Sequence, residues 1–199
     1  MPASRPAPLV VIVVLALVTA GCAAFEDPPE PTRLTAPPQG APTPATATQA
    51  FTEADRLFAQ LMVQHHAQAL DLADLVPDRT GNPEVRALAQ EVVAARQPEV
   101  ERLAAWLQEW GARTDVELAD HPGMRGMPSE AQLQALREAD GPEFDRLWLE
   151  SMIRHHEGAV VMAETVLSAG THRPTLELAE DIRSARQVEI TRIGAMLGP

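Results

Sequence analysis

Apolar residues recur at helical spacing over most of the chain, and no stretch shows the alternation of a half-buried strand. Thr52, with an acidic residue three positions later, is typical of a helix N-terminus. Prolines near the first position of later segments mark further starts. The pattern therefore predicts four long helices and one short one, over residues 52–76, 83–110, 129–140, 142–169 and 174–199.

The first pair of long helices is repeated in the second pair. The aligned segments are residues 55–73 with 145–163 and residues 88–107 with 178–197, without a gap. Each repeated unit is a helical hairpin that cannot cover its own apolar stripe, so two such units should pack together. We predict an all-α fold, a ferritin-like four-helix bundle with halves at about 51–110 and 141–199 and a linker over 111–140.

The N-terminal residues are typical of an exported lipoprotein. A single basic residue precedes an apolar run from Leu9 to Val18, which is too short to span a bilayer, so residues 1–21 are predicted to be a signal peptide. Cys22, the only cysteine, follows Thr-Ala-Gly in a sequence that resembles the lipobox of bacterial lipoproteins, whose cysteine is lipidated. Ordinary secretory cleavage nearby is the alternative.

Residues 22–50 are rich in Pro, Thr, Ala and Gln and lack the apolar side chains of a core. They should form an extended, disordered tether to a folded domain over 51–199. The formal net charge of −12 argues against nucleic acid or anionic lipid as partners and is compatible with cations. The expected partners are the membrane, through the Cys22 anchor, and a metal ion. Neither the oligomeric state nor an envelope protein partner follows from the sequence.

Each hairpin carries a histidine pair in its first helix, His65-His66 and His155-His156. On a helical projection His65 falls at the centre of the apolar stripe and His66 on its flank, and the second pair repeats this placement. One histidine of each pair should therefore point into the bundle. Such a recurrence at matched depth favours a metal site over two unrelated polar pairs.

Two carboxylates are expected at the depth of the histidines. Counting outward from the inter-helix turns places Glu99 within a helical turn of His66, and Glu189 beside His156. Both glutamates lie on apolar stripes, and burial of an unpaired carboxylate is costly. Each therefore needs a partner, which could be a histidine, an arginine or a metal ion.

Met62 and Met152 each precede a histidine pair by three residues, which puts a thioether and an imidazole on one helix face. That combination suits copper, with methionine favouring the cuprous state. The dimetal carboxylate bundles have Glu at this position, so the Met weighs against a ferroxidase-like enzyme. The predicted metal ligands are Met62, His65, His66, Met152, His155 and His156, with Glu99 and Glu189 as further ligands or as acceptors for the histidines.

Plainer interpretations compete with this one. The histidines could be a hydrogen-bonded core pair, and the methionines could be core filler. Arg96 and Arg186 should be solvated unless they pair with the buried glutamates. Met124 and Met127 are loop residues in one interpretation and part of a peripheral site in another, and His172 is expected to be a turn residue without a role.

These motifs resemble the bacterial family of unknown function numbered 305. The matching segments are Asp55 with Met62-Val63-Gln64-His65-His66, Glu143-Phe144-Asp145 with Met152-Ile153-Arg154-His155-His156-Glu157-Gly158-Ala159, the linker Gly123-Met124-Arg125-Gly126-Met127, and Gln97 with Glu99 and Gln187 with Glu189. The resemblance covers about 51–199 and implies a duplicated ferritin-like bundle. Some exported members of this family bind copper. Leu103 and Ile193 stand where the family often has Met.

The leading hypothesis is a membrane-anchored extracytoplasmic protein that binds a metal, with copper expected, for buffering or delivery. The alternative is a structural or protein-interaction lipoprotein in which the histidines only satisfy Glu99 and Glu189. A redox enzyme with a dinuclear centre between the halves is a third possibility. The chain shows no nucleophilic triad and no phosphate-binding loop, so catalysis is not the first expectation.

Overall fold

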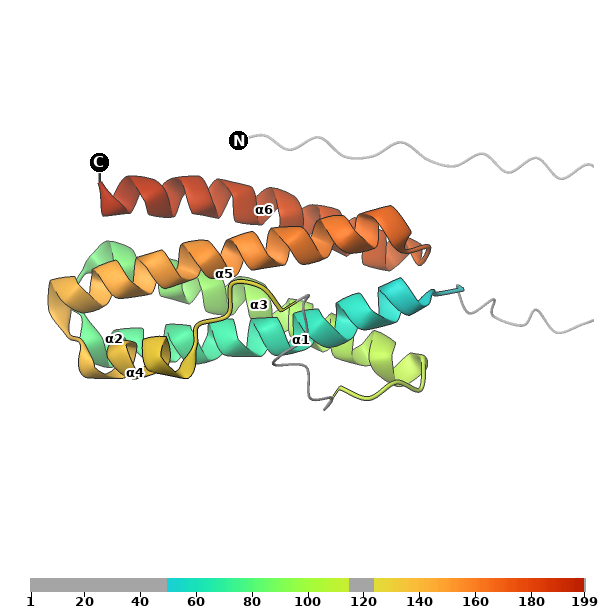
Figure 1. Cartoon of the computed structure of the whole chain (residues 1–199), viewed down its shortest axis with the longest axis horizontal. Coiled ribbons are helices and arrows are strands. Elements are labelled where there is room, and N and C mark those ends of the chain that lie inside the picture. The colour runs from blue at the N-terminus through green and yellow to red at the C-terminus, as the bar shows by residue number, and fades with distance from the viewer. Residues whose placement is uncertain (1–49, 115–123, 199) are drawn as a thin grey trace, which may run out of the picture. The chain divides into compact units, whose positions relative to one another are not determined.

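The structure is a computed structural model that describes residues 50–114 and 124–198. The expected signal peptide, Cys22 and the tether up to residue 49 lie outside the described residues. Within the described ranges every regular element is a helix (Figure 1). The helices are α1 (Glu53–Asp74), α2 (Val76–Arg79), α3 (Pro83–Glu109), α4 (Glu130–Glu138), α5 (Gly141–Ala169) and α6 (Arg173–Leu197). The predicted all-α fold is confirmed, and no helix in these ranges combines the length and apolarity needed to cross a bilayer.

Helix starts follow the predicted capping residues. Thr52 and Asp55 form a capping box at α1, in which the Asp55 carboxylate accepts from the Thr52 backbone N–H at 2.8 Å. Asn82 caps α3 by accepting from the Glu84 N–H at 3.0 Å. The turn expected after the first helix is partly helical, because α1 ends at Asp74 and the short α2 follows almost at once.

The four long helices form the predicted bundle of two hairpins. In Figure 1, α1 packs along α3 and α5 packs along α6, while α1 and α5 provide the main contact between the hairpins. Buried positions match across the repeat; examples are Phe58 with Trp148, Ala69 with Ala159, Leu88 with Leu178, Val92 with Ile182 and Leu103 with Ile193. The internal duplication seen in the sequence is therefore also a duplication of the core.

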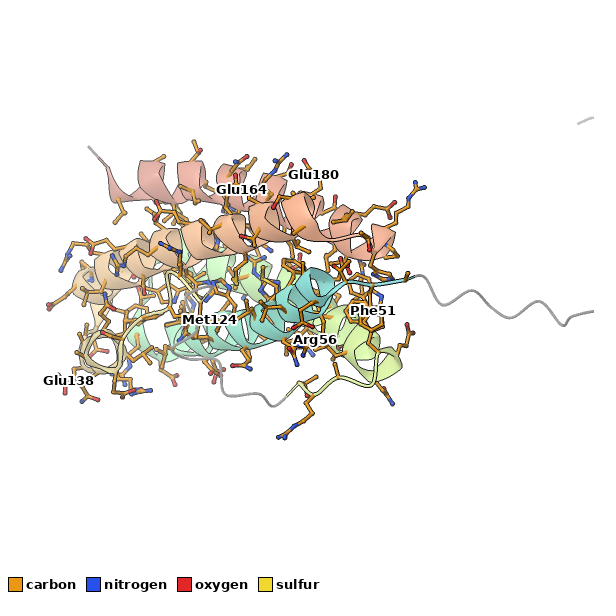
Figure 2. All side chains as sticks on the ribbon, turned by 45° about the vertical axis from the view of Figure 1, so that its right-hand side comes forward. Phe51, Arg56, Met124, Glu138, Glu164 and Glu180 are labelled. Atoms are coloured by element: carbon orange, nitrogen blue, oxygen red, sulfur yellow. The ribbon has the colours of Figure 1, made fainter. Side chains whose placement is uncertain are left out.

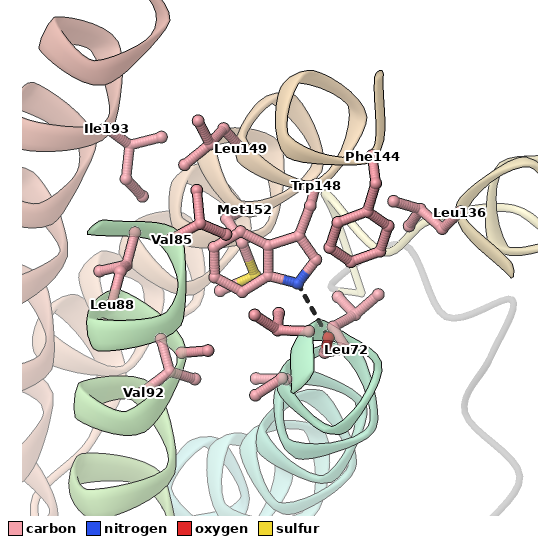
Figure 3. Packing of buried hydrophobic residues seen from close by; sticks show 14 of the residues in the cluster. Leu72, Val85, Leu88, Val92, Leu136, Phe144, Trp148, Leu149, Met152 and Ile193 are labelled. Carbon is pink, nitrogen blue, oxygen red and sulfur yellow. Dashed lines mark hydrogen bonds between the residues drawn. The ribbon is translucent and has the colours of Figure 1, made fainter. Parts of the chain in front are cut away.

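The apolar core is split into two clusters. The Trp148 cluster joins the end of α1 to the start of α5, and Trp148 Nε1 donates to the Leu72 carbonyl at 2.8 Å (Figure 3). The Phe58 cluster joins the start of α1 to the end of α5 and includes Met62 and Met162. The two helices are therefore antiparallel, and residues midway along them lie between the clusters.

The linker crosses α5 at very short range. Gly126 has φ 79°, and a Cβ built on it would lie 1.9 Å from the Arg154 carbonyl oxygen. A Cβ on Gly158 would lie 1.9 Å from the Arg125 carbonyl oxygen. Only glycine at both positions allows this backbone approach. Met124, labelled in Figure 2, is thereby held against the Phe58 cluster.

Residues near the α5–α6 turn are joined to the start of α1. The Asp55 carboxylate accepts from the backbone N–H groups of Thr171 at 3.0 Å and His172 at 3.2 Å. The His172 ring lies 2.8 Å from the Thr175 hydroxyl and packs edge-on against Trp106. His172 therefore has a structural role, contrary to the expectation from its place in a turn.

Candidate metal centre

The four histidines of the repeated motif are buried together in the middle of the bundle. Each has 1% of its surface exposed. The rings of His65 and His155 nearly stack where α1 crosses α5, with centroids 3.7 Å apart and planes 34° from parallel. His66 and His156 lie farther out, with centroids 6.2 Å and 6.4 Å from those of their neighbours. Two adjacent residues from each hairpin thus form one imidazole layer.

Both members of each pair are buried, whereas only one was predicted to point inward. The flank positions His66 and His156 are covered because α3 and α6 bring side chains over them. Glu99 Oε2 lies 2.7 Å from His66 Nε2, and Glu189 Oε2 lies 2.6 Å from His156 Nε2. The predicted depth of both glutamates is therefore confirmed.

Two arginines complete the layer. Arg96 Nη2 donates to Glu189 Oε2 at 2.9 Å, from α3 to α6. Arg186 donates from Nη1 to both Glu189 oxygens at 2.9 Å and from Nη2 to Glu99 Oε2 at 3.1 Å. Each arginine side chain is 1% exposed, whereas the side chain of Glu99 is 17% exposed and that of Glu189 is 23% exposed. The prediction that Arg96 and Arg186 are solvated is wrong. Both are buried and paired with the glutamates, which was the stated alternative.

The arginines carried a sequence signal that could have identified them. Arg96 follows Val92 by four residues and precedes Glu99 by three, so it continues the apolar stripe of its helix. Arg186 has the same relation to Ile182 and Glu189 in the second half. A charged residue at a matched stripe position in both halves marks a buried pair rather than a solvated face.

Burial sets the protonation of the imidazoles. Desolvation, reinforced by the neighbouring histidines and by Arg96, holds the pKa of His65 well below its usual value. Burial likewise lowers the pKa of His155 and His156. For His66 burial outweighs the opposing contact with Glu99, and its pKa is about 4. All four rings are therefore neutral at pH 7, the form in which imidazole binds metals.

The carboxylates and arginines keep their charges. Burial acts to raise the pKa of Glu99 and Glu189, but contact with a histidine and the nearby guanidinium charges outweigh it and hold both below the usual range. Burial and the charge of Arg186 lower the pKa of Arg96 to about 10. With two arginines and two glutamates ionised and the histidines neutral, the layer has no net charge.

Several ring nitrogens of the layer have no hydrogen-bond partner. These are both nitrogens of His65, Nε2 of His155, and Nδ1 of His66 and His156. Nε2 of His66 and of His156 instead lies next to a carboxylate oxygen, at 2.7 Å and 2.6 Å. An unpartnered buried polar atom costs about 1–3 kcal/mol. The layer thus holds lone pairs that a soft cation could accept.

The donors are grouped, but not as a closed cage. Among the described residues no three His, Cys, Asp or Glu side chains converge to hold one ion. Met62 and Met152 are fully buried but belong to different clusters, one on each side of the imidazole layer. The predicted ligands therefore share one region of the core, with the two thioethers at its opposite faces. Whether any of them binds a metal stays a prediction.

Fold and site together define the class: a duplicated all-α bundle with a buried layer of histidine, arginine and glutamate between two apolar clusters. The chain belongs to the family described as a domain of unknown function, DUF305, which it matches over residues 55–197. A curated relative, the uncharacterized protein L153 of Acanthamoeba polyphaga mimivirus, is 29% identical over 65 residues. That match spans 33% of this chain and 42% of the viral protein.

Solved structures show the same fold. A DUF305 fragment from Deinococcus radiodurans is 34% identical with a TM-score of 0.69, covering 74% of this chain and 97% of that one. A putative secreted DUF305 protein from Streptomyces coelicolor is 30% identical with a TM-score of 0.68, covering 72% and 90%. CopM in its Cu(I)-bound form is 28% identical with a TM-score of 0.61, covering 71% and 94%. CopM has also been solved bound to Cu(II) and to silver.

Proposed function

We propose that this protein is an exported metal-binding protein whose imidazole layer holds copper for buffering or delivery. The observation that carries the proposal is the set of buried, neutral histidines with unpartnered ring nitrogens at the α1–α5 crossing. Neutral imidazole is a good ligand for copper, and thioether sulfur favours the cuprous ion. His65 and His155 are the proposed primary donors because both rings are buried at the crossing and have unpartnered nitrogens.

The contacts of His66 and His156 suit a supporting role for the glutamates. Metal-binding histidines usually turn their second ring nitrogen to a carboxylate, which fixes the tautomer and the ring orientation. Glu99 and Glu189 face the Nε2 atoms, while the Nδ1 atoms of both rings are buried without a partner. We therefore assign the glutamates as acceptors for the histidines rather than as ligands.

The residues fit a soft ion of low coordination number better than a hard one. No closed set of three His, Cys, Asp or Glu side chains is found in the described ranges, which disfavours a rigid tetrahedral or octahedral site. Cu(I) accepts few donors, and Met62 and Met152 place soft sulfur on both sides of the imidazoles. CopM has been solved with copper and with silver bound, which supports copper as the metal without choosing its oxidation state.

Competition titration with Cu(I) tests the proposal. The sample is the full chain with Cys22→Ser throughout, so that a free thiol does not contribute. His65→Leu with His155→Leu removes the primary donors while filling their space, and we expect Cu(I) affinity to fall at least about a hundredfold, about 2.7 kcal/mol. His172→Gln is the matched control, since His172 is buried at the end of the bundle and contacts Thr175. It should bind as the unsubstituted chain does.

Circular dichroism on each variant shows whether the helices persist. Equal, weak binding by all three chains, with helices intact, would refute the metal-binding proposal. A second double variant, His65→Gln with His66→Gln, removes the pair of one hairpin only and distinguishes one shared site from two. Loss of all bound metal indicates one shared layer, and loss of half indicates a separate site in each hairpin.

One observation favours the alternative of a structural or protein-interaction lipoprotein without a metal site. The Arg–Glu contacts already join α3 to α6 and satisfy both carboxylates without an ion. A structural or interaction lipoprotein would need nothing more from this layer. It predicts that metal does not change the melting temperature, whereas a site that binds only the folded state raises it with metal concentration.

We also propose that the domain is exported and held at a membrane through Cys22. The lipobox-like sequence supports this, and the Streptomyces relative is described as secreted. Fractionation of cells that express the chain and its Cys22→Ser variant tests the anchor. The parent should sediment with membranes and the variant should be released; equal distribution would contradict the anchor without affecting the metal proposal.

A further inference from the structure

The two arginines of the layer are held very differently. Arg186 donates to both Glu99 and Glu189 through its two terminal nitrogens. Arg96 has a single hydrogen bond, to Glu189, and its Nη1 is buried without a partner, as is the Nε of Arg186. Glu189 is also shared, since both of its oxygens accept from Arg186. Arg96 is therefore the less neutralised of two buried cations.

The charge of Arg96 acts on the innermost imidazoles. It is among the causes that lower the pKa of His65 and of His155. Arg96 Nη2 and His156 Nε2 both contact Glu189 Oε2, at 2.9 Å and 2.6 Å, so the guanidinium lies at the edge of the imidazole layer. A cation at the His65–His155 contact would thus face a positive neighbour and neutral ligands, while both carboxylates are already paired with arginines.

This environment penalises ionic charge. The cost of moving an ion from water into a buried site grows as the square of its charge, so a divalent ion suffers about four times the penalty of a monovalent one of equal size. Repulsion by Arg96 grows in direct proportion to the ionic charge. Both effects act in the same direction, and the layer supplies no net negative charge to offset them.

We propose that Arg96 makes the imidazole layer select a soft monovalent cation, Cu⁺ or Ag⁺, over a divalent cation. This inference rests on the proposed metal-binding function and deepens it by assigning the charge of the cargo and the residue that determines it. Arg96 acts here as a specificity residue through its charge and does not coordinate the ion. The CopM structures do not decide the matter, because they include both copper oxidation states.

Ag(I) and Zn(II) are suitable probes because neither changes oxidation state during a titration. The full chain with Cys22→Ser is compared with the same chain carrying Arg96→Gln, and the change in each dissociation constant is measured by competition. Because Coulomb energy is proportional to ionic charge, removal of one positive charge that strengthens Ag(I) binding by some factor should strengthen Zn(II) binding by about the square of that factor. We expect gains of about threefold for Ag(I) and about tenfold for Zn(II).

Two controls separate charge from structure. Arg154→Gln removes an exposed positive charge next to His155 in sequence, and solvent screening should leave both affinities unchanged. Arg96→Lys keeps the charge and should retain the discrimination of the parent chain. Arg96→Leu is a second neutral variant, to be used if Arg96→Gln does not fold by circular dichroism, and it adds no soft donor.

The outcomes distinguish the two proposals. The inference is supported if the neutral Arg96 variants gain more affinity for Zn(II) than for Ag(I), and if Arg154→Gln and Arg96→Lys show no such difference. Equal changes for both ions, with Ag(I) binding still abolished by His65→Leu and His155→Leu, overturn the role of Arg96 and leave metal binding standing. If the double histidine variant binds Ag(I) as well as the parent chain, the metal-binding function itself fails and this inference fails with it.

Discussion

At the residue scale, the buried layer balances its charges unevenly. Arg96 relies on Glu189 alone, while Arg186 is held by both glutamates. Glu189 therefore supports two buried guanidinium groups and Glu99 supports one. Because Glu99 and Glu189 occupy matching positions of the internal repeat, the same substitution at each position can be compared directly.

This asymmetry predicts unequal effects of two matched substitutions. Glu189→Gln leaves Arg96 without a carboxylate contact, and because Glu189 is partly exposed we expect a loss of about 2–3 kcal/mol, below the 3–5 kcal/mol of a fully buried pair. Glu99→Gln leaves Arg186 paired with Glu189 and should cost about 1 kcal/mol. Urea unfolding measures both free energies. Equal losses would show that the two arginines are held equally.

The histidines predict a loss of stability in mild acid when no metal is present. His66 has an ordinary pKa of 6.5 and a pKa of about 4 in the folded chain, so the unfolded chain binds more protons between these values. Stability is therefore complete above pH 6.5 and falls as the pH drops toward 4, by up to about 1.4 kcal/mol per pH unit for each such histidine. The other three histidines act in the same direction.

Urea unfolding at pH 7.5 and pH 5, with a chelator present, tests this slope. Between pH 7.5 and pH 5 the free energy of unfolding should fall less in the variant with His65→Leu and His155→Leu than in the parent chain, because the variant retains two of the four histidines. A profile that is flat in the parent chain would mean that the rings are not buried in their neutral form.

At the element scale, local signals predicted the helices well. Caps such as Thr52 and Asn82 fixed the starts of α1 and α3 because they satisfy backbone N–H groups within a few residues. The short α2 could not be anticipated, since a proline-containing turn and one helical turn have nearly the same local sequence. The crossing of Gly126 over α5 was also beyond prediction, because it depends on contact between segments far apart in sequence.

Because the linker crosses α5 so closely, a single added methyl group at Gly158 should destabilise the fold. Gly158→Ala would place Cβ 1.9 Å from a backbone oxygen that cannot rotate away. We expect a loss of about 1–3 kcal/mol, the usual cost of overpacking. Gly194→Ala is the matched control in α6, where a Cβ meets nothing within 4 Å, and it should be neutral or stabilise by about 0.5–1 kcal/mol. Thermal unfolding of both variants gives the comparison.

At the scale of the whole molecule, duplication explains how one short motif creates a large buried layer. An antiparallel pairing of two similar hairpins brings the middle of α1 against the middle of α5, so each histidine pair meets its own copy. The sequence was sufficient to predict that one histidine of each pair points into the bundle, and the depth of Glu99 and Glu189, but it left open whether the two pairs meet. It was not sufficient to predict how the arginines share the carboxylates, because that depends on side-chain packing between α3 and α6.

The separation of Met62 from Met152 has the same origin. Each stands one helical turn before its histidine pair, so an antiparallel arrangement sends the two thioethers to opposite sides of the layer. A parallel pairing would have brought them together. Helix direction, which the sequence pattern alone does not specify, therefore decides how many soft donors can meet one ion.

The most direct test of the account is an anomalous difference map from crystals of the full chain, with Cys22→Ser, loaded with Ag(I). The strongest peak should lie in the core where α1 crosses α5, within bonding distance of ring nitrogens of His65 and His155. Silver found only at surface side chains, with the imidazole layer free of anomalous signal at saturating metal, would contradict the proposed function.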